Sequence, residues 1–538
     1  MKTALIKAPW WVRYCPPYIL AYFSSYLRYF GHQAFCFDLN NLFYHRCDDE
    51  NKKYWDNRDF YSVWENNTFT DTILEISKAD SLIQEIVETG SEIFIFDTHT
   101  PSVNISYAVA RRIKQINKNA VVVFLGHKAA KTQMAYDFAE QPFIDYVCYG
   151  EADIPLKELL EKLQKGFDIA NLPKCRGFLF KSNGKVVDCG GSDFIKDLDD
   201  VPIPDYSDFK EDILNNRYSQ PHRLDILDSR GCINACHFCY ERLFWPKYRT
   251  MSAKKLYGQV LKHTRDFPQI NYFYFNGLLL NGNLKVLEEF CDLIIDNGIK
   301  ISWAGQAAVR NDMTLDLLKK MKKAGCGWVG YGIESGSQKV LNAMNKNFDI
   351  KNALALFKNT RDAGISFQIN IMCGFPVETE EDFEQTLDFL KMARPYVNSI
   401  LASQSFFTLE KCTFVKNNPE KFGITDASHH LYWKSKDNDY PKRFERYERL
   451  CRLAIELRYP ETSGISAVKP DKWFLLGEYY FYDKNFAMAR ECYQKSADVE
   501  FKSKEIFKKL IETSVKLNDN ESKKKYENQL KTIFGEAD

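Results

Sequence analysis

The sequence predicts an α/β protein in three parts: an N-terminal doubly wound Rossmann-like domain, a partial (β/α)6 barrel and a C-terminal α-helical repeat. Short apolar runs alternate with helix-like stretches over residues 1–200, as they do in doubly wound sheets. The same alternation resumes over residues 224–407, where six strand-then-helix units favour a parallel barrel. The end of the chain has helical periodicity alone.

The expected domain boundaries follow these changes of pattern. A Pro-rich passage at residues 200–205 is typical of a linker, because proline stops both helices and sheet ladders. We therefore expect the doubly wound domain at residues 1–200, the barrel at 201–407, a barrel-associated region at 408–468 and the helical tail at 469–538.

The individual elements of the two α/β parts can be placed from their periodicity. In the first part, strands are expected at residues 4–7, 34–37, 93–97, 120–126 and 146–149, with helices at 18–30 and 103–117. Residues 47–70 show no clear period, so an insertion is expected there. In the barrel, strands are expected at residues 224–228, 272–276, 299–303, 329–333, 367–372 and 399–406. The site should then lie at the carboxyl ends of these strands.

The tail has the spacing of a tetratricopeptide helix pair. The residues that carry this spacing are Trp473, Leu476, Gly477, Tyr480, Ala489 and Tyr493. Helices around residues 503–517 and 522–534 are expected to complete a small stack, because repeats need neighbours to bury their faces. Such a stack could recruit a peptide or a carrier protein, and capping of the barrel is an equal alternative.

Charge and cysteine content limit the function. The net charge is +1, from 73 basic and 72 acidic side chains, so no nucleic-acid partner is expected. Apolar runs are far shorter than the roughly 20 residues of a membrane span, and Lys7 interrupts the first run before it could act as a secretory signal. We expect a cytoplasmic protein with no membrane contact, whose 15 cysteines are reduced thiols or metal ligands.

Three cysteines follow the first expected barrel strand directly. Cys232, Cys236 and Cys239 lie within eight residues, and thiolates are soft ligands suited to iron-sulfur clusters or zinc. Zinc would need four closed ligands, for which His237 is a candidate, so this alternative stays open. Three ligands on a four-iron cluster leave one iron open, and an open iron can bind a molecule while delivering an electron to it.

The spacing of the triplet, with Phe238 just before the last cysteine, resembles the radical S-adenosylmethionine (SAM) superfamily. The resemblance covers roughly residues 224–407. It implies that the cysteines are catalytic ligands of a 4Fe-4S cluster, whose open iron chelates SAM. Reductive cleavage would yield a 5′-deoxyadenosyl radical that abstracts hydrogen from a substrate, and an electron donor is implied.

Further segments agree with this family. The end of residues 324–337, Gly-Ile-Glu-Ser-Gly-Ser, resembles a family strand, which implies that Glu334 and Ser335 face the ribose and methionyl part of SAM. A strand-to-helix turn with Ser335 or Ser337 as N-cap is compatible with that role. Residues 374–379 resemble a family turn whose role is to shape the loop.

Two other family positions give weaker signals. Arg310 matches an arginine after the third strand that pairs with the methionyl carboxylate, although a solvated arginine is an even alternative. Asn276 occupies a place where relatives carry an acidic segment near the methionine amine, and the acid is missing here.

The order of domains resembles the cobalamin-binding subfamily. The resemblance implies that Thr100, Ser102 and Gly126 lie in loops that hold cobalamin. Gly150–Asp153 matches a helix start of these domains, and an effect of Asp153 on the helix dipole alone is the alternative. Two positions depart from the pattern. Residues 8–11 replace the segment that supplies a lower-axial histidine, and Leu125 replaces the first glycine of a Gly-Gly pair. No ligand role is transferred to His99, and a domain that only packs on the barrel stays an alternative.

Three functions remain open from the sequence. The first is cobalamin-dependent methyl transfer to an unactivated carbon of a small-molecule or peptide substrate. The second is a cobalamin-independent radical rearrangement, oxidation or cyclisation. The third, from another class, is a scaffold or peptide-binding protein whose cluster is structural. The mass of the product separates the first two, and failure to cleave SAM favours the third.

Overall fold

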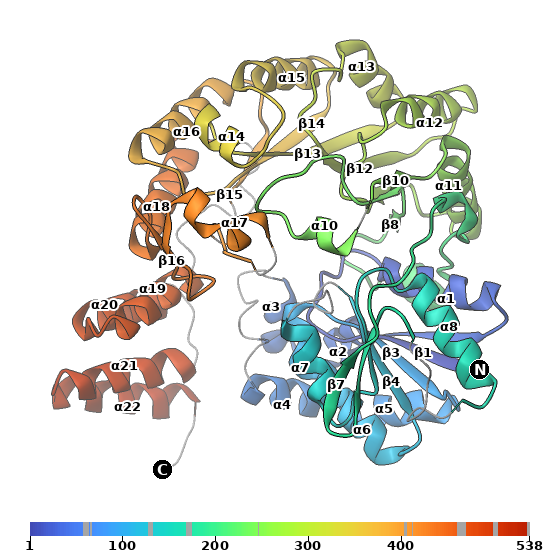
Figure 1. Cartoon of the computed structure of the whole chain (residues 1–538), viewed down its shortest axis with the longest axis horizontal. Helices are drawn as coiled ribbons and strands as arrows, with labels where there is room; N and C mark the ends of the chain where they lie inside the picture. Colours follow the sequence, from blue (N-terminus) through green and yellow to red (C-terminus); the bar gives the residue numbers. More distant parts are fainter. Residues whose placement is uncertain are drawn as a thin grey trace.

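The computed structural model describes residues 1–56, 64, 67–126, 133–167, 175–245, 247–402, 406–410, 413–459, 470–498 and 504–534. The N-terminal domain, the barrel and the helical tail are separate bodies of the cartoon, and α10 (Glu241–Phe244) lies on the side of the barrel that faces the N-terminal domain (Figure 1). This arrangement follows the predicted order of parts.

A parallel sheet forms the centre of the N-terminal domain. Its strands run in the order β2 (Gln33–Asp38), β1 (Lys2–Lys7), β3 (Ile93–Asp97), β4 (Val121–Leu125) and β5 (Tyr146–Cys148). The strand order reverses between β1 and β3, so this is a doubly wound sheet whose ligand crevice is expected at the carboxyl ends of these two strands. Two antiparallel strands that we did not predict, β6 (Phe178–Ser182) and β7 (Lys185–Asp188), extend the edge.

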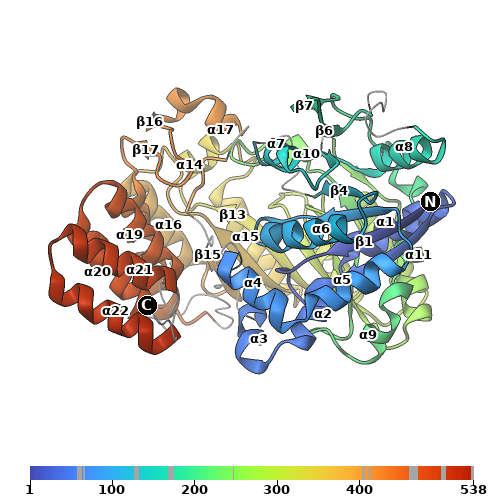
Figure 2. The same cartoon turned by 90° about the horizontal axis from the view of Figure 1, so that it is seen from below.

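Helices cover both faces of this sheet (Figures 1 and 2). They are α1 (Tyr18–Tyr29), α2 (Leu39–Arg46), α3 (Asp49–Asp56), α4 (Asn67–Ile76), α5 (Ala79–Glu88), α6 (Val103–Ile116), α7 (Gln133–Glu140) and α8 (Asp153–Gln164). The expected insertion contains α3 and the start of α4. Its aromatic residues enter the core, where the rings of Trp55 and Trp64 meet edge to face at 4.7 Å.

Six parallel strands form an open partial barrel. Their order is β15 (Ser399–Ala402), β14 (Ser366–Ile371), β13 (Cys326–Glu334), β12 (Ser302–Ala307), β11 (Tyr272–Phe275) and β8 (Arg223–Ile226). Helices α11 (Ala253–Asp266), α12 (Leu284–Asp296), α13 (Leu315–Lys323), α15 (Ile350–Asp362) and α16 (Glu380–Ala393) connect the strands on the outside. β8 and β15 are the two free edges, so the sheet does not close.

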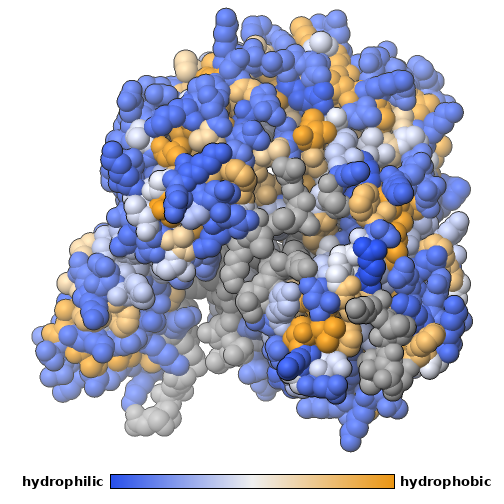
Figure 3. All heavy atoms as spheres, in the orientation of Figure 1, coloured by the Kyte–Doolittle hydropathy of each residue, from blue (hydrophilic) through white to orange (hydrophobic). Residues whose placement is uncertain are grey.

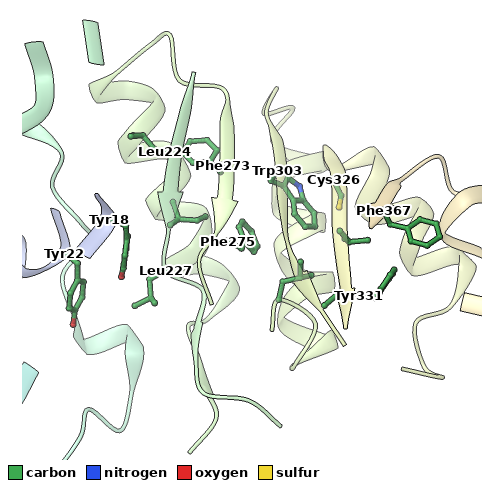
Figure 4. Close-up of a cluster of buried hydrophobic side chains, with 14 of the residues drawn as sticks. Tyr18, Tyr22, Leu224, Leu227, Phe273, Phe275, Trp303, Cys326, Tyr331 and Phe367 are labelled. Carbon is green, nitrogen blue, oxygen red and sulfur yellow. The ribbon is translucent and has the colours of Figure 1, made fainter. Parts of the chain in front are cut away.

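Side chains alternate between two layers along these strands. Leu224 of β8 and Phe273 of β11 are fully buried and belong to the apolar layer that Figure 4 shows. Phe275 stacks on Trp303 with ring centroids 5.1 Å apart. The intervening residues of β8 and β11 are only half-buried, because they point to the inner face of the sheet.

The third barrel strand differs from its prediction. We expected it at residues 299–303, but β12 spans Ser302–Ala307. Ile299 belongs to the turn that ends α12, because its N–H donates to Ile294 O at 3.1 Å after Gly298 has turned the chain with a φ of 64°. The strand instead continues through Gly305, a residue type with low strand propensity, because it pairs with neighbours on both sides.

The remaining chain packs at one end of the barrel. It contains α17 (Phe414–Asn417), β16 (Ile424–Asp426), β17 (Lys434–Ser435) and α18 (Tyr440–Glu456). Four helices follow: α19 (Pro470–Tyr482), α20 (Phe486–Asp498), α21 (Lys504–Lys516) and α22 (Asn520–Phe534). A Cβ at Gly477 would lie 2.5 Å from the Tyr493 ring, so the small residue allows α19 and α20 to approach. The assignment of this tail to tetratricopeptide repeats stays a prediction.

The face of the molecule in Figure 3 is mostly hydrophilic, with small separated apolar areas. Among the residues that the structure describes, no helix combines the length and the apolar character needed to cross a bilayer.

Candidate functional site

A cavity of about 800 Å³ lies between the N-terminal domain and the barrel. Residues of β1, β3 and β4 line one side, and inward residues of β8, β11, β12, β13 and β14 line the other. Tyr18, from the start of α1, also lines it and reaches toward Leu227 just beyond β8 (Figure 4). Among the residues that the structure describes, the buried Tyr18 hydroxyl has no hydrogen-bond partner, which is a costly state that a bound ligand would relieve.

The N-terminal side of the cavity is built at the β1/β3 switch point. Lys7, at the end of β1, donates to Asp97 Oδ2 at 2.5 Å, and His99 Nε2 lies 3.3 Å from the same oxygen. Trp11 stacks on His99 with ring centroids 4.3 Å apart. Burial alone would raise the pKa of Asp97, but the Lys7 ammonium and His99 outweigh it and hold this pKa well below its usual range. We call the contacts of Lys7 and His99 with Asp97 the brace; the sequence analysis did not predict it.

The barrel side of the cavity carries polar side chains on an aromatic background. Arg223 Nε donates to Asp225 Oδ1 at 2.8 Å, within β8. Gln306 Nε2 donates to the Tyr274 hydroxyl at 3.1 Å. Trp328 lines the cavity from β13. These residues lie on the inner face of the sheet. Gln306 belongs to this face because β12 extends to Ala307.

Charged residues also join the two domains directly. Arg230, which precedes the cysteine triplet, pairs with Glu151 and Asp153 of the N-terminal domain at 2.8 Å each. All three side chains are at most 4% exposed. Arg249 pairs with the same Glu151. The role of Asp153 is therefore larger than the helix-dipole effect expected from sequence, because it fixes the loop that starts the triplet.

The three cysteines lie on the loop between β9 (Ser229–Arg230) and α10, and each is a free, half-buried thiol. The Asn234 N–H points at Cys232 Sγ at 3.4 Å. Burial raises the pKa of Cys239 to about 12, so its thiolate form needs a cationic partner such as iron. Within the described part of the chain, no group of three His, Cys, Asp or Glu is close enough to hold a single metal ion. The soft donor set fits an iron-sulfur cluster, which takes thiolate ligands.

Glu334 forms an ion pair beside this loop. Its carboxylate accepts from Lys346 at 3.3 Å, and the pair is only 15% and 10% exposed. The Lys346 ammonium lies 5.6 Å from the centre of the Phe238 ring. Burial alone would lower the pKa of Lys346, but Glu334, Cys236 and Cys232 outweigh burial and raise this pKa. Sequence analysis missed Lys346, which lies 12 positions after Glu334 and carries no motif of its own. Lys346 supplies a positive charge near the thiolates that Cys232 and Cys236 would present to a cluster.

The other expected SAM residue of this segment has a different place. Ser335 is fully buried, and its hydroxyl contacts the Thr386 hydroxyl at 3.2 Å. Ser337 accepts from Val340 N–H and caps α14 (Gln338–Ala343), as one of the two predicted alternatives. Ser335 therefore supports the turn, whereas Glu334 carries the charge near the cysteines.

The turn at residues 374–379 shapes its loop, as expected. Gly374 N–H donates to Glu378 Oε2 at 2.8 Å, and Arg446 of α18 pairs with the same oxygen at 3.2 Å. A Cβ at Gly374 would fall 2.2 Å from Arg443 Cγ, so this position has room only for glycine.

Asn276 and Arg310 are placed differently. Asn276 lines the cavity at the end of β11. Beside it, Asp228, from the segment between β8 and β9, accepts from Gly277 N–H at 2.7 Å, which brings a carboxylate to the place where the sequence lacked one. Arg310 is engaged locally, because Asp312 takes two of its nitrogens and the carbonyls of residues 281 and 282 take a third. The structure does not bring Arg310 to the cavity wall that it describes.

Of the three residues expected to hold cobalamin, Gly126 lines the cavity, whereas Thr100 and Ser102 are not among the lining residues. Gly126 lines the cavity, and a Cβ there would lie 2.6 Å from Thr98 O, so contact with the neighbouring loop requires glycine. Ser102 is buried and its hydroxyl accepts from His99 N–H at 2.9 Å, which makes it a local cap. Thr100 lies in the same short turn, half-buried. His127, the next residue of the loop that contains Leu125 and Gly126, lies outside the described residues.

Comparisons with known proteins show which proteins this chain is similar to. The model of the radical SAM superfamily matches residues 226–390. An uncharacterized methyltransferase of Pyrococcus horikoshii is 29% identical over 333 residues, which cover 61% of this chain and 68% of that protein. The anaerobic magnesium-protoporphyrin IX monomethyl ester cyclase of Cereibacter sphaeroides is 25% identical over 59% of this chain and 52% of that protein. The chain thus matches about half to two thirds of the length of these relatives.

Solved structures extend the likeness to the N-terminal domain. The cobalamin-dependent radical SAM enzyme OxsB with aqua-cobalamin bound superimposes with a TM-score of 0.64 at 12% identity, over 99% of this chain and 84% of that one. The radical SAM methyltransferase TsrM from Kitasatospora setae, with cobalamin and a 4Fe-4S cluster, gives a TM-score of 0.59 at 13% identity, over 92% and 99%. At these identities the likeness is one of fold. The family match, together with the cysteine loop and its barrel, identifies residues 226–390 of this chain as a radical SAM domain.

Proposed function

We propose that this radical SAM enzyme depends on cobalamin and transfers a methyl group to an unactivated carbon of its substrate. One observation carries the proposal: the cavity joins the β1/β3 switch point of a doubly wound domain to the inner face of the radical SAM sheet. Cofactors of such domains bind at the switch point. A cofactor held there would face a substrate held in the barrel.

The radical SAM domain supplies the first half of the chemistry. Such domains hold a 4Fe-4S cluster and SAM, and Cys232, Cys236 and Cys239 are the ligands that this chain offers. The cluster needs an electron donor. Lys346 and Glu334 lie beside the thiols. Their charges would act on the cluster and on the methionyl part of SAM when these are bound.

The N-terminal side of the cavity fits a large flat cofactor. Trp11, His99, Gly126 and Gly150 line it and would hold the ring system, and the open space beside Gly150 has no atom within 4 Å of a Cβ placed there. When bound, cobalamin supplies a cobalt centre that carries a methyl group. His99 Nε2 is already engaged with Asp97, so the brace does not offer this nitrogen as an axial ligand.

Anaerobic reconstitution tests the proposal. The purified chain would be loaded with iron, sulfide and cobalamin, and bound cobalt would be measured beside 5′-deoxyadenosine formed under dithionite. We expect stoichiometric cobalt and SAM cleavage, with a product 14 mass units heavier than the acceptor, as one CH₂ requires. Cys239→Ala should lose the cluster and the cleavage while it keeps cobalt.

A cobalamin-independent radical rearrangement, oxidation or cyclisation is the second candidate. Leu125 favours it, because this side chain stands at the cavity where the subfamily pattern has glycine. The relative from Cereibacter sphaeroides is named a cyclase. Deoxyadenosine without bound cobalt, and a product without the added methyl mass, would support this candidate. No SAM cleavage by the reconstituted chain would favour a scaffold with a structural cluster.

A further inference from the structure

The inner face of the barrel carries one ordered row of side chains across four strands. By strand register, Asp225 of β8 lies beside Tyr274 of β11, which lies beside Ala304 of β12, which lies beside Trp328 of β13. A carboxylate, a phenol ring, a methyl group and an indole ring therefore follow one another along the cavity wall. At the next position of β13 on this face, Gly330 makes room for the Gln306 and Trp328 side chains, because a Cβ there would lie 2.5 Å from Gln306 Oε1 and 2.8 Å from the Trp328 ring.

The charged pair at the start of this row is incomplete. Arg223 uses Nε for Asp225 Oδ1 at 2.8 Å and Nη1 for Gln220 at 3.1 Å. Among the described residues, no hydrogen-bond partner is present for Asp225 Oδ2 or Arg223 Nη2. Both side chains line the cavity and are only 14% and 10% exposed. Partly desolvated charges with unused atoms are unfavourable unless a ligand completes them.

The surroundings of the pair limit the ligand. The Arg223 guanidinium lies 4.5 Å from the Tyr274 ring centre and 5.0 Å from that of Tyr14, so its charge is held in place by aromatic faces. Among the described lining residues, four carboxylates (Asp97, Glu151, Asp153, Asp225) face three cations (Lys7, Arg223, Arg230). This balance disfavours phosphate-rich ligands, because a polyanion needs excess positive charge.

A second polar group from the other domain points to the same space. Tyr18 is 91% buried and lines the cavity, and the described part of the chain offers its hydroxyl no hydrogen-bond partner. Asp225 is among the charges that act on this phenol, after burial and the charges of Arg230, Asp153 and Asp228. The hydroxyl can donate to a ligand carboxylate.

We propose that Arg223 and Asp225 form the recognition subsite for the methyl acceptor, and that this acceptor is a small zwitterion, an α-amino acid with an aromatic side chain. The inference rests on the proposed function of the same cavity. The carboxylate of the ligand meets Arg223 Nη2 and its ammonium meets Asp225 Oδ2, while the side chain lies along Tyr274 and Trp328. A residue inside a peptide lacks both charges and leaves the pair incomplete.

Calorimetric titration of the full, cluster-loaded chain tests the inference in the presence of SAM and without reductant. The probes are L-tryptophan, L-tyrosine and L-phenylalanine, each as the free amino acid, the N-acetyl derivative and the carboxamide. At least one free amino acid should bind, and each blocking group should weaken it roughly tenfold or more, because a charge-assisted contact is lost. Binding of none of the three, or equal binding of the blocked forms, overturns the inference.

Two variants assign the charges. In Asp225→Asn the free amino acid should bind roughly tenfold more weakly, and N-acetylation should cost nothing further. Arg223→Gln should behave in the same way toward the carboxamide. Lys358→Gln, which breaks an exposed pair with Asp362 on α15, should bind every probe as the wild type does. Penalties that persist in both site variants contradict the assignment, and the wild-type derivative series decides the question if a variant fails to fold.

The outcome is separable from that of the proposed function. Bound cobalt and deoxyadenosine formation report on the methyl-transfer proposal without an amino acid. Their presence together with no zwitterion binding rejects the subsite alone. Zwitterion binding to a chain that takes up no cobalt keeps the subsite and rejects cobalamin dependence.

Discussion

Two ion pairs line the same cavity but differ in what they connect. Lys7 and Asp97 stand 90 residues apart, on the ends of β1 and β3, and are 1% and 7% exposed. Arg223 and Asp225 stand two residues apart on one strand, at 10% and 14% exposure. The first pair holds two strands together across the switch point. The second pair lies within one strand, where Cys15 Sγ and the Tyr14 ring also contact it, and it leaves Asp225 Oδ2 and Arg223 Nη2 available to a ligand.

Asp97→Ala should give the largest effect. It leaves the Lys7 ammonium buried without its carboxylate, and breaking a buried pair in this way costs about 3–5 kcal/mol of folding stability. Urea unfolding followed by circular dichroism measures the change. Asp362→Ala, which removes an exposed carboxylate, is the matched control and should stay within about 0.5 kcal/mol. A loss below about 1 kcal/mol for Asp97→Ala would contradict the brace.

Arg230→Ala extends the comparison to a pair that joins two domains. It leaves Asp153 and Glu151 buried against fewer donors, so a loss of about 3 kcal/mol is expected. Faster proteolysis at residues 200–205 should accompany it, because the domains are then held less firmly. Arg230→Lys keeps the charge but loses the planar guanidinium that binds two carboxylates. Its stability and its rate of proteolysis should therefore lie between those of the wild type and Arg230→Ala. Equal proteolysis of all three proteins would show that this cluster does not hold the domains together.

The pH dependence of stability should report on the first pair. The folded-state pKa of Asp97 lies below its unfolded value, so its contribution is complete above about pH 4 and is lost as pH falls through the folded pKa. Each pKa unit by which folding lowers the pKa of Asp97 corresponds to about 1.4 kcal/mol of folding stability. Stability measured from pH 6 to pH 3 should fall less steeply in Asp97→Asn than in the wild type. Parallel curves would mean that other carboxylates dominate the acid limb.

Asp225→Asn should give the smallest effect on folding, at most about 1 kcal/mol. The amide oxygen still accepts from Arg223, and no second strand depends on the contact. Thermal melting of the two proteins side by side measures it. A loss as large as that of Asp97→Ala would erase the distinction between a brace and a recognition pair.

The sequence predicted the cysteine loop and most strands correctly, because both signals are local. The spacing of Cys232, Cys236 and Cys239 placed them on one loop, and Gly-Ile-Glu-Ser located Glu334. Prediction failed for β12, where pairing on both sides outweighed the low propensity of Gly305. It also did not reveal the contact of the Ser335 hydroxyl with Thr386, which is 51 residues away, and the role of Ser335 toward SAM stays a prediction.

The sequence by itself determined the order of parts, the radical SAM domain and the ligands that it offers, since apolar periodicity and motif spacing are properties of short segments. Only the tertiary structure decided which charges meet. Lys7 with Asp97, Arg230 with Asp153 and Lys346 with the cysteine loop are long-range contacts, made when strand ends and domains pack together. The cavity exists for the same reason, because its walls come from two domains whose approach no local pattern records.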